Sequence, residues 1–336
     1  MPPQAVTAQP RPFVDFNDVW LAYNADFLAQ QRFAVEAIDL QVGRGEFIAI
    51  VGPSGCGKST FMKLATGLKL PSRGKILIDG APVTGPLKVS GMAFQAPSLL
   101  PWRSTLANVL LPLEIVEPYR SNFKAKRGEY EERARQLLKK VGLAGYEDQF
   151  PWQLSGGMQQ RASICRALIH EPKMLLLDEP FGALDAFTRE DLWCVLRDLW
   201  TEQKFNVILV THDLRESVFL ADTVYVMSGS PGRFVVKREI DLPRPRDLET
   251  TYTQEFITIV QELRGHIGAA RSASTAPVSS LSPVSSLSPV SSIAPTPPGH
   301  ARYMPAVQFG QAESAAAPAP SLPGAPGAPG VPGPHP

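Results

Sequence analysis

The chain has 336 residues, and with 44% hydrophobic and 19% charged residues most of it can bury a core. A formal net charge of +1, without a long basic run, argues against a protein that binds nucleic acid. Three scattered cysteines, Cys56, Cys165 and Cys194, fit a reducing compartment better than a disulfide framework. Every apolar run is far shorter than a membrane span, so we expect contact with a membrane only through a partner.

Residues 1–12 are rich in Pro and Gln, which predicts a flexible N-terminus, and residues 13–268 are expected to form the globular part. Continuous apolar runs of strand length recur in that part, between stretches of helical character. Such runs are typical of a parallel sheet that is covered on both faces, so we predict an α/β fold. The runs are at 47–51, 174–177, 207–210 and 224–227.

The first of these runs ends in the loop G-P-S-G-C-G-K-S-T at 52–60, and a helix is predicted over 59–68. This order of strand, glycine-rich loop and helix fits the phosphate-binding P-loop. Glycines let the backbone wrap around phosphate oxygens, while Lys58 supplies a charge and the Ser59 hydroxyl suits Mg²⁺. The predicted nucleoside triphosphate site comprises Gly52, Pro53, Ser54, Gly55, Cys56, Gly57, Lys58, Ser59 and Thr60.

Cys56 lies inside this loop and has two interpretations. We favour that of a small residue tolerated at this position. In the alternative, Lys58 lowers the pKa of the thiol and makes it a redox switch.

The stretch at about 96–165 differs from its surroundings and predicts an inserted helical subdomain. Tyr130, Ala134, Leu137, Leu138 and Val141 recur at helical spacing beside charged residues. We expect an amphipathic helix that packs on the surface of the subdomain.

Two polar segments follow later apolar runs. Asp178 and Glu179 come directly after the run at 174–177, and His212 follows the run at 207–210. Side chains at the C-terminal ends of parallel strands face the ligand crevice. We therefore expect Asp178 to hold Mg²⁺, Glu179 to polarise the attacking water as general base, and His212 to contact the γ-phosphate.

From residue 269 to 336 the chain is dominated by Pro, Ser, Ala and Gly. Such a composition cannot bury enough apolar surface to offset the entropy of ordering, so a disordered tail is predicted. Ser-Pro steps and proline segments leave open a regulatory or binding role for this tail.

The motif L-S-G-G-M-Q-Q-R at 154–161, combined with the P-loop, Asp178, Glu179 and His212, makes residues 13–268 resemble the ATP-binding subunits of ABC transporters. The resemblance implies a P-loop NTPase core with a small N-terminal antiparallel β-subdomain, and a homodimer that sandwiches two ATP molecules. It further implies that Ser155, Gly156 and Gly157 open a helix facing the ATP of the opposite subunit.

The resemblance gives roles to further residues. Gln95 would sense Mg²⁺ and water, and Leu184 with Asp185 would cross the dimer interface. Met158 departs from the family, since many members carry Gln there.

An aromatic residue near the first strand stacks on adenine in this family. Tyr23 is the candidate, because it closes the segment 16–23 ahead of an inserted loop, and an aromatic face suits a planar base. Phe33 is the competitor, and either residue could instead belong to the core.

Other stretches resemble the nitrate, sulfonate and taurine importer group, which also serves bicarbonate. These are F-Q-A-P-S-L-L-P-W-R at 94–103, D-E-P-F-G-A-L-D-A at 178–186 and M-S-G-S-P-G-R at 227–233.

The resemblance to this importer group implies transmembrane permease subunits as partners, docked at 99–103 through Leu100 and Trp102, unless these side chains pack internally. A periplasmic or extracellular solute-binding protein would take part indirectly. The chain would lie at the cytoplasmic face of the inner membrane, and the solute would be small and anionic. A non-transport ABC ATPase acting on DNA or ribosomes is the alternative.

Overall fold

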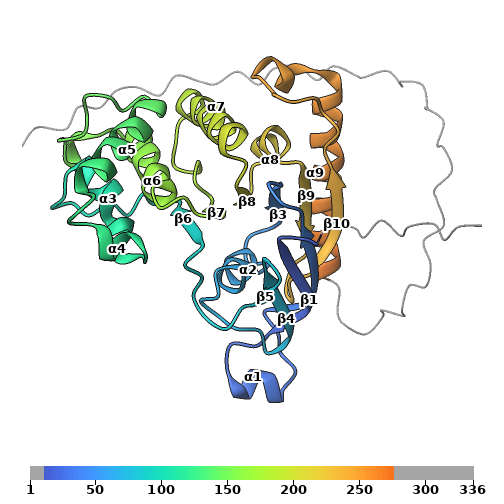
Figure 1. Ribbon diagram of the computed structural model, residues 1–336. Coiled ribbons are helices and arrows are strands. Elements are labelled where there is room, and N and C mark those ends of the chain that lie inside the picture. The colour runs from blue at the N-terminus through green and yellow to red at the C-terminus, as the bar shows by residue number, and fades with distance from the viewer. Residues whose placement is uncertain (1–10, 276–336) are drawn as a thin grey trace, which may run out of the picture. The chain divides into compact units, whose positions relative to one another are not determined.

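Two sheets organise the part of the chain that the structure, a computed structural model, describes, namely residues 11–275 (Figure 1). The larger sheet has the strand order β10-β9-β3-β8-β7-β6, and all its neighbours are parallel except β10 with β9. Its strands are β3 Phe47–Val51, β6 Ser90–Phe94, β7 Met174–Asp178, β8 Asn206–Thr211, β9 Thr223–Met227 and β10 Phe234–Glu239. The predicted α/β fold with a parallel sheet is confirmed.

Alternating side chains explain why these strands are apolar throughout. In β3, Phe47, Ala49 and Val51 enter one hydrophobic core, while Ile48 and Ile50 enter a second core on the opposite face. Successive side chains of a strand point to opposite faces, so a sheet covered on both sides needs apolar residues at every position. All five residues of β3 are fully buried.

The smaller sheet forms the N-terminal antiparallel β-subdomain that the family resemblance implies. It has the order β2-β1-β4-β5, with β1 Val14–Leu21, β2 Val35–Val42, β4 Arg73–Ile78 and β5 Ala81–Pro82. Phe16 of β1 stacks on Phe61 of the helix after the P-loop, with ring centroids 5.0 Å apart. This contact joins the small sheet to the core that carries the P-loop.

Helices α3 to α6 gather at one end of the molecule, beyond the edge strand β6 (Figure 1). They lie where helices were expected, at about 96–165, and α5 contains the predicted amphipathic pattern except for Val141, which caps its C-terminal end. The helices of the described residues are α1 Ala25–Ala29, α2 Lys58–Ala65, α3 Thr105–Ile115, α4 Tyr119–Asn122, α5 Arg127–Lys140, α6 Gly156–Leu168, α7 Ala186–Gln203, α8 Leu214–Leu220 and α9 Gln254–Thr275, with short 3₁₀ turns at Pro151–Gln153 and Glu249–Tyr252. Within residues 11–275, no helix has both the length and the apolar character that crossing a membrane requires.

The last helix extends beyond the predicted boundary at residue 268. α9 continues to Thr275, because Leu263, Ile267 and Ala270 recur at helical spacing, with Leu263 and Ala270 buried. Gly265 and Gly268 interrupt the apolar pattern, so the sequence did not predict that the helix continues past residue 268. Most of the predicted tail, and residues 1–10 of the predicted flexible N-terminus, lie outside the described residues.

Candidate nucleotide site

The strand order brings the P-loop, Asp178 and His212 together at the C-terminal ends of three neighbouring strands of the larger sheet. β3 lies directly beside β8, and β8 beside β7, with Val51 in register with Thr211 and Asp178 with Val210. The P-loop follows β3, His212 follows β8, and Asp178 is the last residue of β7. Residues that are more than 100 positions apart in the chain therefore share one crevice, as the topology of parallel sheets dictates.

The P-loop has the backbone that phosphate binding requires. Gly55 and Gly57 have φ values of +77° and +104°, a region that L side chains rarely adopt. α2 begins at Lys58 without a side chain capping its first N–H groups, so these donors are left for an anion. The Lys58 ammonium donates to the carbonyls of Gly52 at 3.0 Å and Pro53 at 3.1 Å, and the Ser59 side chain is exposed.

The segment around Gly232, far along the chain, packs against the P-loop. The sequence did not predict this contact. The Gly232 carbonyl accepts from Glu36 N and its N–H donates to Ala34 O, both at 3.0 Å, while Arg233 forms an ion pair with the buried Glu36. A side chain on Gly232 would collide with the Cys56 carbonyl of the P-loop. The signal in the sequence was the Pro-Gly pair that follows the apolar run at 224–227.

The structure favours the interpretation of Cys56 as a small buried residue. Its side chain is fully buried, and burial raises the pKa of the thiol, with Lys58 opposing that shift only in part. Since thiolates are the reactive form, a raised pKa argues against a redox switch.

Glu179 and His212 meet in the site. His212 Nδ1 lies 3.3 Å from Glu179 Oε2. The neighbouring Asp178 has a raised pKa because of burial and the charge of Glu179, with Lys58 acting in the opposite direction. Lys58 and Glu179 therefore both lie within electrostatic reach of Asp178, as a site for a phosphate and a cation requires.

Three oxygen-bearing side chains form the set expected to bind Mg²⁺. Asp178 and the exposed Ser59 offer a carboxylate and a hydroxyl, which are hard ligands. Gln95 follows β6 and its amide lies 3.2 Å from the position that a Cβ on Gly182 would take, in the loop after Glu179. The chemistry of these donors fits the ion.

The residues of the L-S-G-G motif belong to the helical subdomain instead. Ser155 caps α6, accepting from Met158 N at 3.3 Å, and α6 begins at Gly156 and contacts α3 and α5. Ser155 and Gly156 are exposed, so the positive end of the helix is open to a second molecule. Leu184 and Asp185 lie before α7, where Asp185 accepts from Thr188 N at 3.1 Å.

Tyr23 and Phe33 differ in their surroundings. The Tyr23 hydroxyl lies 2.5 Å from Thr60 Oγ1 of the P-loop helix, and the side chain is 45% exposed. The Phe33 ring packs edge-on against Trp20 at 4.9 Å and lies under the Arg73 guanidinium at 5.2 Å. Tyr23 is thus bonded to the helix of the P-loop and partly open to solvent, whereas the Phe33 ring already has partners.

We expect replacement of Tyr23 by Ala to raise the KM for ATP about tenfold, because stacking on a base contributes about 1–3 kcal/mol. Tyr23→Phe keeps the ring and should stay within about twofold of wild type, since only the bond to Thr60 is lost. Steady-state ATPase assays of both variants measure this, with Phe33→Ala as the control. A larger KM increase for Phe33→Ala than for Tyr23→Ala would reverse the assignment.

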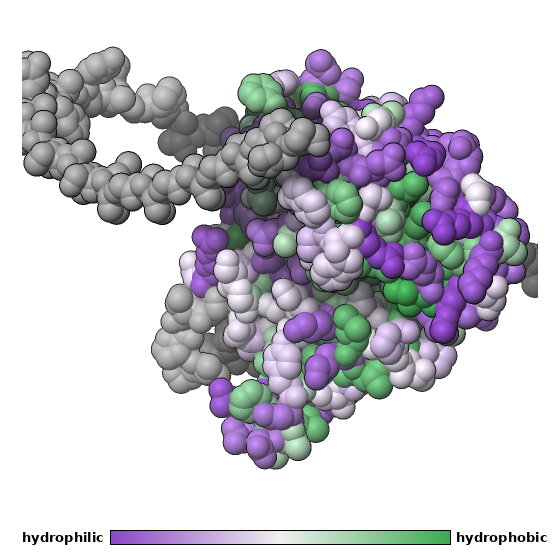
Figure 2. Space-filling view, turned by 90° about the vertical axis from the view of Figure 1, so that its left-hand side faces the viewer, coloured by the Kyte–Doolittle hydropathy of each residue, from purple (hydrophilic) through white to green (hydrophobic). Residues whose placement is uncertain are grey.

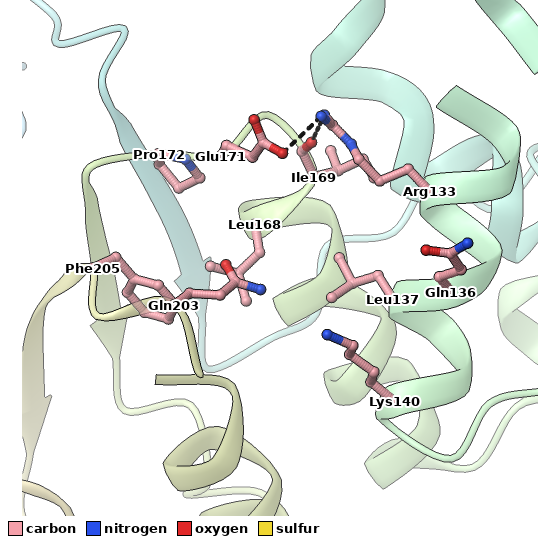
Figure 3. Close-up of a pocket in the computed structure, with 10 residues that line it drawn as sticks. All are labelled: Arg133, Gln136, Leu137, Lys140, Leu168, Ile169, Glu171, Pro172, Gln203 and Phe205. Carbon is pink, nitrogen blue, oxygen red and sulfur yellow. Dashed lines mark hydrogen bonds and ion pairs between the residues drawn. The ribbon is translucent and has the colours of Figure 1, made fainter. Parts of the chain in front are cut away.

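A separate cavity of about 480 Å³ lies between α5 and the end of α7, lined by Arg133, Lys140, Gln203 and Phe205 among others (Figure 3). Its charged groups already have partners. Arg133 bonds to Glu171 at 3.0 Å and to the Ile169 carbonyl, and Lys140 bonds to Glu202 at 2.7 Å. We interpret it as a seam between the helical subdomain and the core.

The surface around the predicted docking segment is partly apolar. Trp102 is 71% exposed, whereas Leu100 is only partly exposed and Leu99 packs against the core. Figure 2 views the molecule from the side of the helical subdomain and shows hydrophobic side chains among hydrophilic ones on this face. Trp102 is therefore available to a partner, while Leu100 is less so than the sequence indicated.

A P-loop after the central strand of a parallel sheet, beside Asp178, Glu179 and His212, defines a P-loop nucleotide-binding protein. Residues 35–182 match the family model described as ABC transporter. The chain belongs to the ATP-binding proteins of ABC transporters and is an ABC transporter ATPase.

Two curated relatives are similar over most of their length. The aliphatic sulfonates import ATP-binding protein SsuB of Bacillus licheniformis is 46% identical over 212 residues, which are 63% of this chain and 79% of the relative. The taurine import ATP-binding protein TauB of Yersinia pestis is 40% identical over 228 residues, covering 68% and 84%.

Solved structures show the same fold. The structure of cbiO1 from Clostridium perfringens, part of the ABC transporter complex cbiONQ, has a TM-score of 0.62 and 27% identity, covering 77% of this chain and 98% of that one. A dimeric structure of the bacterial ABC transporter cassette MJ0796 has a TM-score of 0.56 and 30% identity, covering 68% and 100%.

Proposed function

We propose that this chain hydrolyses ATP to power an importer of a small anionic solute of the sulfonate or taurine class. Two copies would sandwich two ATP molecules, each between the P-loop of one copy and Ser155, Gly156 and Gly157 of the other. The observation that carries the proposal is the 3.3 Å contact of Glu179 with His212 beside the P-loop, combined with the exposed start of α6. The names of the relatives SsuB and TauB support the solute class.

The chain's own groups divide the work of hydrolysis. Lys58 and the N–H groups at the start of α2 would bind the phosphates. Glu179 would accept a proton from the attacking water, and His212, held beside it, would contact the γ-phosphate. Ser59, Asp178 and Gln95 would hold Mg²⁺, which supplies positive charge to the phosphate oxygens when bound.

The second half of the site must come from another molecule. Ser155 and Gly156 lie on the helical subdomain, and the dimeric structure of a similar cassette supports pairing of two copies. ATP bound by both copies would favour the closed dimer, and hydrolysis would release it. ATP then shifts the equilibrium by its higher affinity for the closed state.

Affinity purification of the tagged full chain from gently solubilised native membranes, followed by mass spectrometry, tests the transport function. We expect a hydrophobic permease and an associated solute-binding protein to co-purify. Recovery of ribosomal or DNA-repair proteins without a permease would contradict transport and favour the non-transport alternative.

Trp102→Ala should lower the recovery of the permease at least tenfold while leaving the ATPase activity of the isolated protein unchanged. Exposed Trp side chains contribute disproportionately at interfaces, which is the reason for this expectation. Tyr252→Ala is the matched control. Tyr252 is also 71% exposed, but it lies in the 3₁₀ turn Glu249–Tyr252, outside the helical subdomain. Equal recovery with both variants would show that Trp102 is not part of the docking surface.

A further inference from the structure

A partly buried arginine, Arg189, links two loops of the nucleotide site. Arg189, in the first turn of α7, donates through Nη2 to the Leu184 carbonyl at 3.0 Å and through Nη1 to Asp213 Oδ2 at 3.2 Å. Leu184 lies in the loop that would meet the second copy, and Asp213 directly follows His212. One planar guanidinium therefore holds both loops at once, a geometry that a lysine cannot reproduce.

Asp213 is fixed on its other side too. Its Oδ1 caps α8 by accepting from Arg215 N at 2.8 Å, and its own N–H donates to Thr211 Oγ1 at 2.9 Å. The Thr211 hydroxyl donates in turn to the buried Glu216. His212 thus lies between two residues whose positions are set by hydrogen bonds, and Arg189 is the contact that connects this arrangement to the loop of Leu184.

The buried Glu216 carboxyl does not compete with Asp213 for the charge of Arg189. Burial raises the pKa of Glu216 to about 8, so this carboxyl is mostly protonated at neutral pH. Asp213 is then the carboxylate that pairs with Arg189. The two side chains of that pair are 30% and 25% exposed, so the pair is screened less than one at the open surface.

A small cavity lies beside Arg189. The cavity measures about 20 Å³ and is lined by Glu179, Arg189, His212, Asp213 and Glu216, among others. This exceeds the roughly 10–15 Å³ that one water needs. Arg189 Nε is buried there and finds no hydrogen-bond partner among the described residues. The guanidinium is thus held by hydrogen bonds through Nη1 and Nη2 and not through Nε.

From these contacts we propose that Arg189 is a positioning residue that couples the loop of Leu184 and Asp185 to His212 and Glu179. The inference rests on the proposed function, because a second copy must press on that loop. When it does, the Leu184 carbonyl, Arg189 and Asp213 carry that contact to His212 and hold it in its position beside Glu179. Hydrolysis then requires a closed dimer, while binding of ATP to the P-loop does not require Arg189.

Arg189→Ala tests the coupling. We expect its kcat to fall about 10- to 100-fold with the KM for ATP within about twofold of wild type, because a misplaced reacting group costs rate rather than binding. Arg215→Ala is the matched control. Arg215 pairs with Glu190 at 3.7 Å across the same two helices, but is not linked by a hydrogen bond to Leu184. A kcat for Arg189→Ala equal to that of this control would overturn the inference.

Two further variants separate coupling from simple stability. Asp213→Asn keeps the helix cap but removes the charge, and in combination with Arg189→Ala it should cost no more than Arg189→Ala alone. Arg189→Lys should recover only part of kcat, since an ammonium keeps the charge but lacks the planar fork of the guanidinium. Additive losses in the double variant, or full recovery with lysine, would contradict the coupling even if Arg189→Ala were poorly folded.

The readout also distinguishes the inference from the function on which it rests. Wild type that neither dimerises with ATP nor hydrolyses it would contradict the proposed function. Wild type that does both, with Arg189→Ala doing both equally well, would overturn only the role of Arg189.

Discussion

Glu179→Gln should lose about 10²- to 10⁴-fold in ATP turnover while still binding ATP, because a positioned general base contributes about that factor. Glutamine has the same shape and can still hydrogen-bond to His212, which lies 3.3 Å away, but it cannot accept a proton from water. With hydrolysis blocked, ATP should hold two copies together. Turnover assays and size-exclusion chromatography with ATP measure both effects.

The control for this variant is Glu190→Gln. Glu190 lies in α7 with a side chain 24% exposed, close to the 27% of Glu179, and it pairs with Arg215 rather than with a residue of the site. We expect its turnover to match wild type. Equal turnover of wild type and Glu179→Gln would rule out Glu179 as the base and leave His212 as the next candidate.

Lys58→Ala should weaken ATP binding about 100-fold or more, in contrast to Glu179→Gln. Hydrogen bonds to charged groups contribute about 1.5–3 kcal/mol each, and Lys58 is expected to reach the outer phosphates. The ammonium now bonds to the Gly52 and Pro53 carbonyls, so its removal also loosens the loop. Titration with a fluorescent ATP analogue measures the change in Kd.

Lys63→Ala in the same helix is the appropriate comparison, since Lys63 is exposed and lies beyond the first turn of α2. Its Kd should stay within about twofold of wild type. If Lys58→Ala bound ATP within about threefold of wild type, the P-loop would not be the principal phosphate site.

The sequence predicted the parts of this site whose signal is local. The P-loop carries its own signature, because a strand, glycines, a lysine and a helix follow one another without interruption. Asp178 and Glu179 could be found because they end an apolar run. These predictions needed no knowledge of which strands are neighbours.

Contacts between distant segments could not be predicted in the same way. The contact between Glu179 and His212 depends on β7 lying beside β8. Hydrophobic periodicity predicts strands but not their order in a sheet. Gly232 appeared to be an ordinary turn residue, although the backbone of the P-loop leaves it no room for a side chain. Arg189 has no motif of its own, and only the folded chain shows which two loops it joins.

The position of β3 in the larger sheet has a consequence for how the protein is made. β3 carries the P-loop, yet both its neighbours, β8 and β9, come much later in the chain. During synthesis both edges of β3 therefore stay unpaired with β8 and β9 until residues 206–227 have left the ribosome. Pairings between such distant segments form slowly, and an exposed apolar strand can associate with other chains in the meantime. A fragment that ends at residue 182 would contain the P-loop, Asp178 and Glu179, but would lack both strands that hold β3 in place.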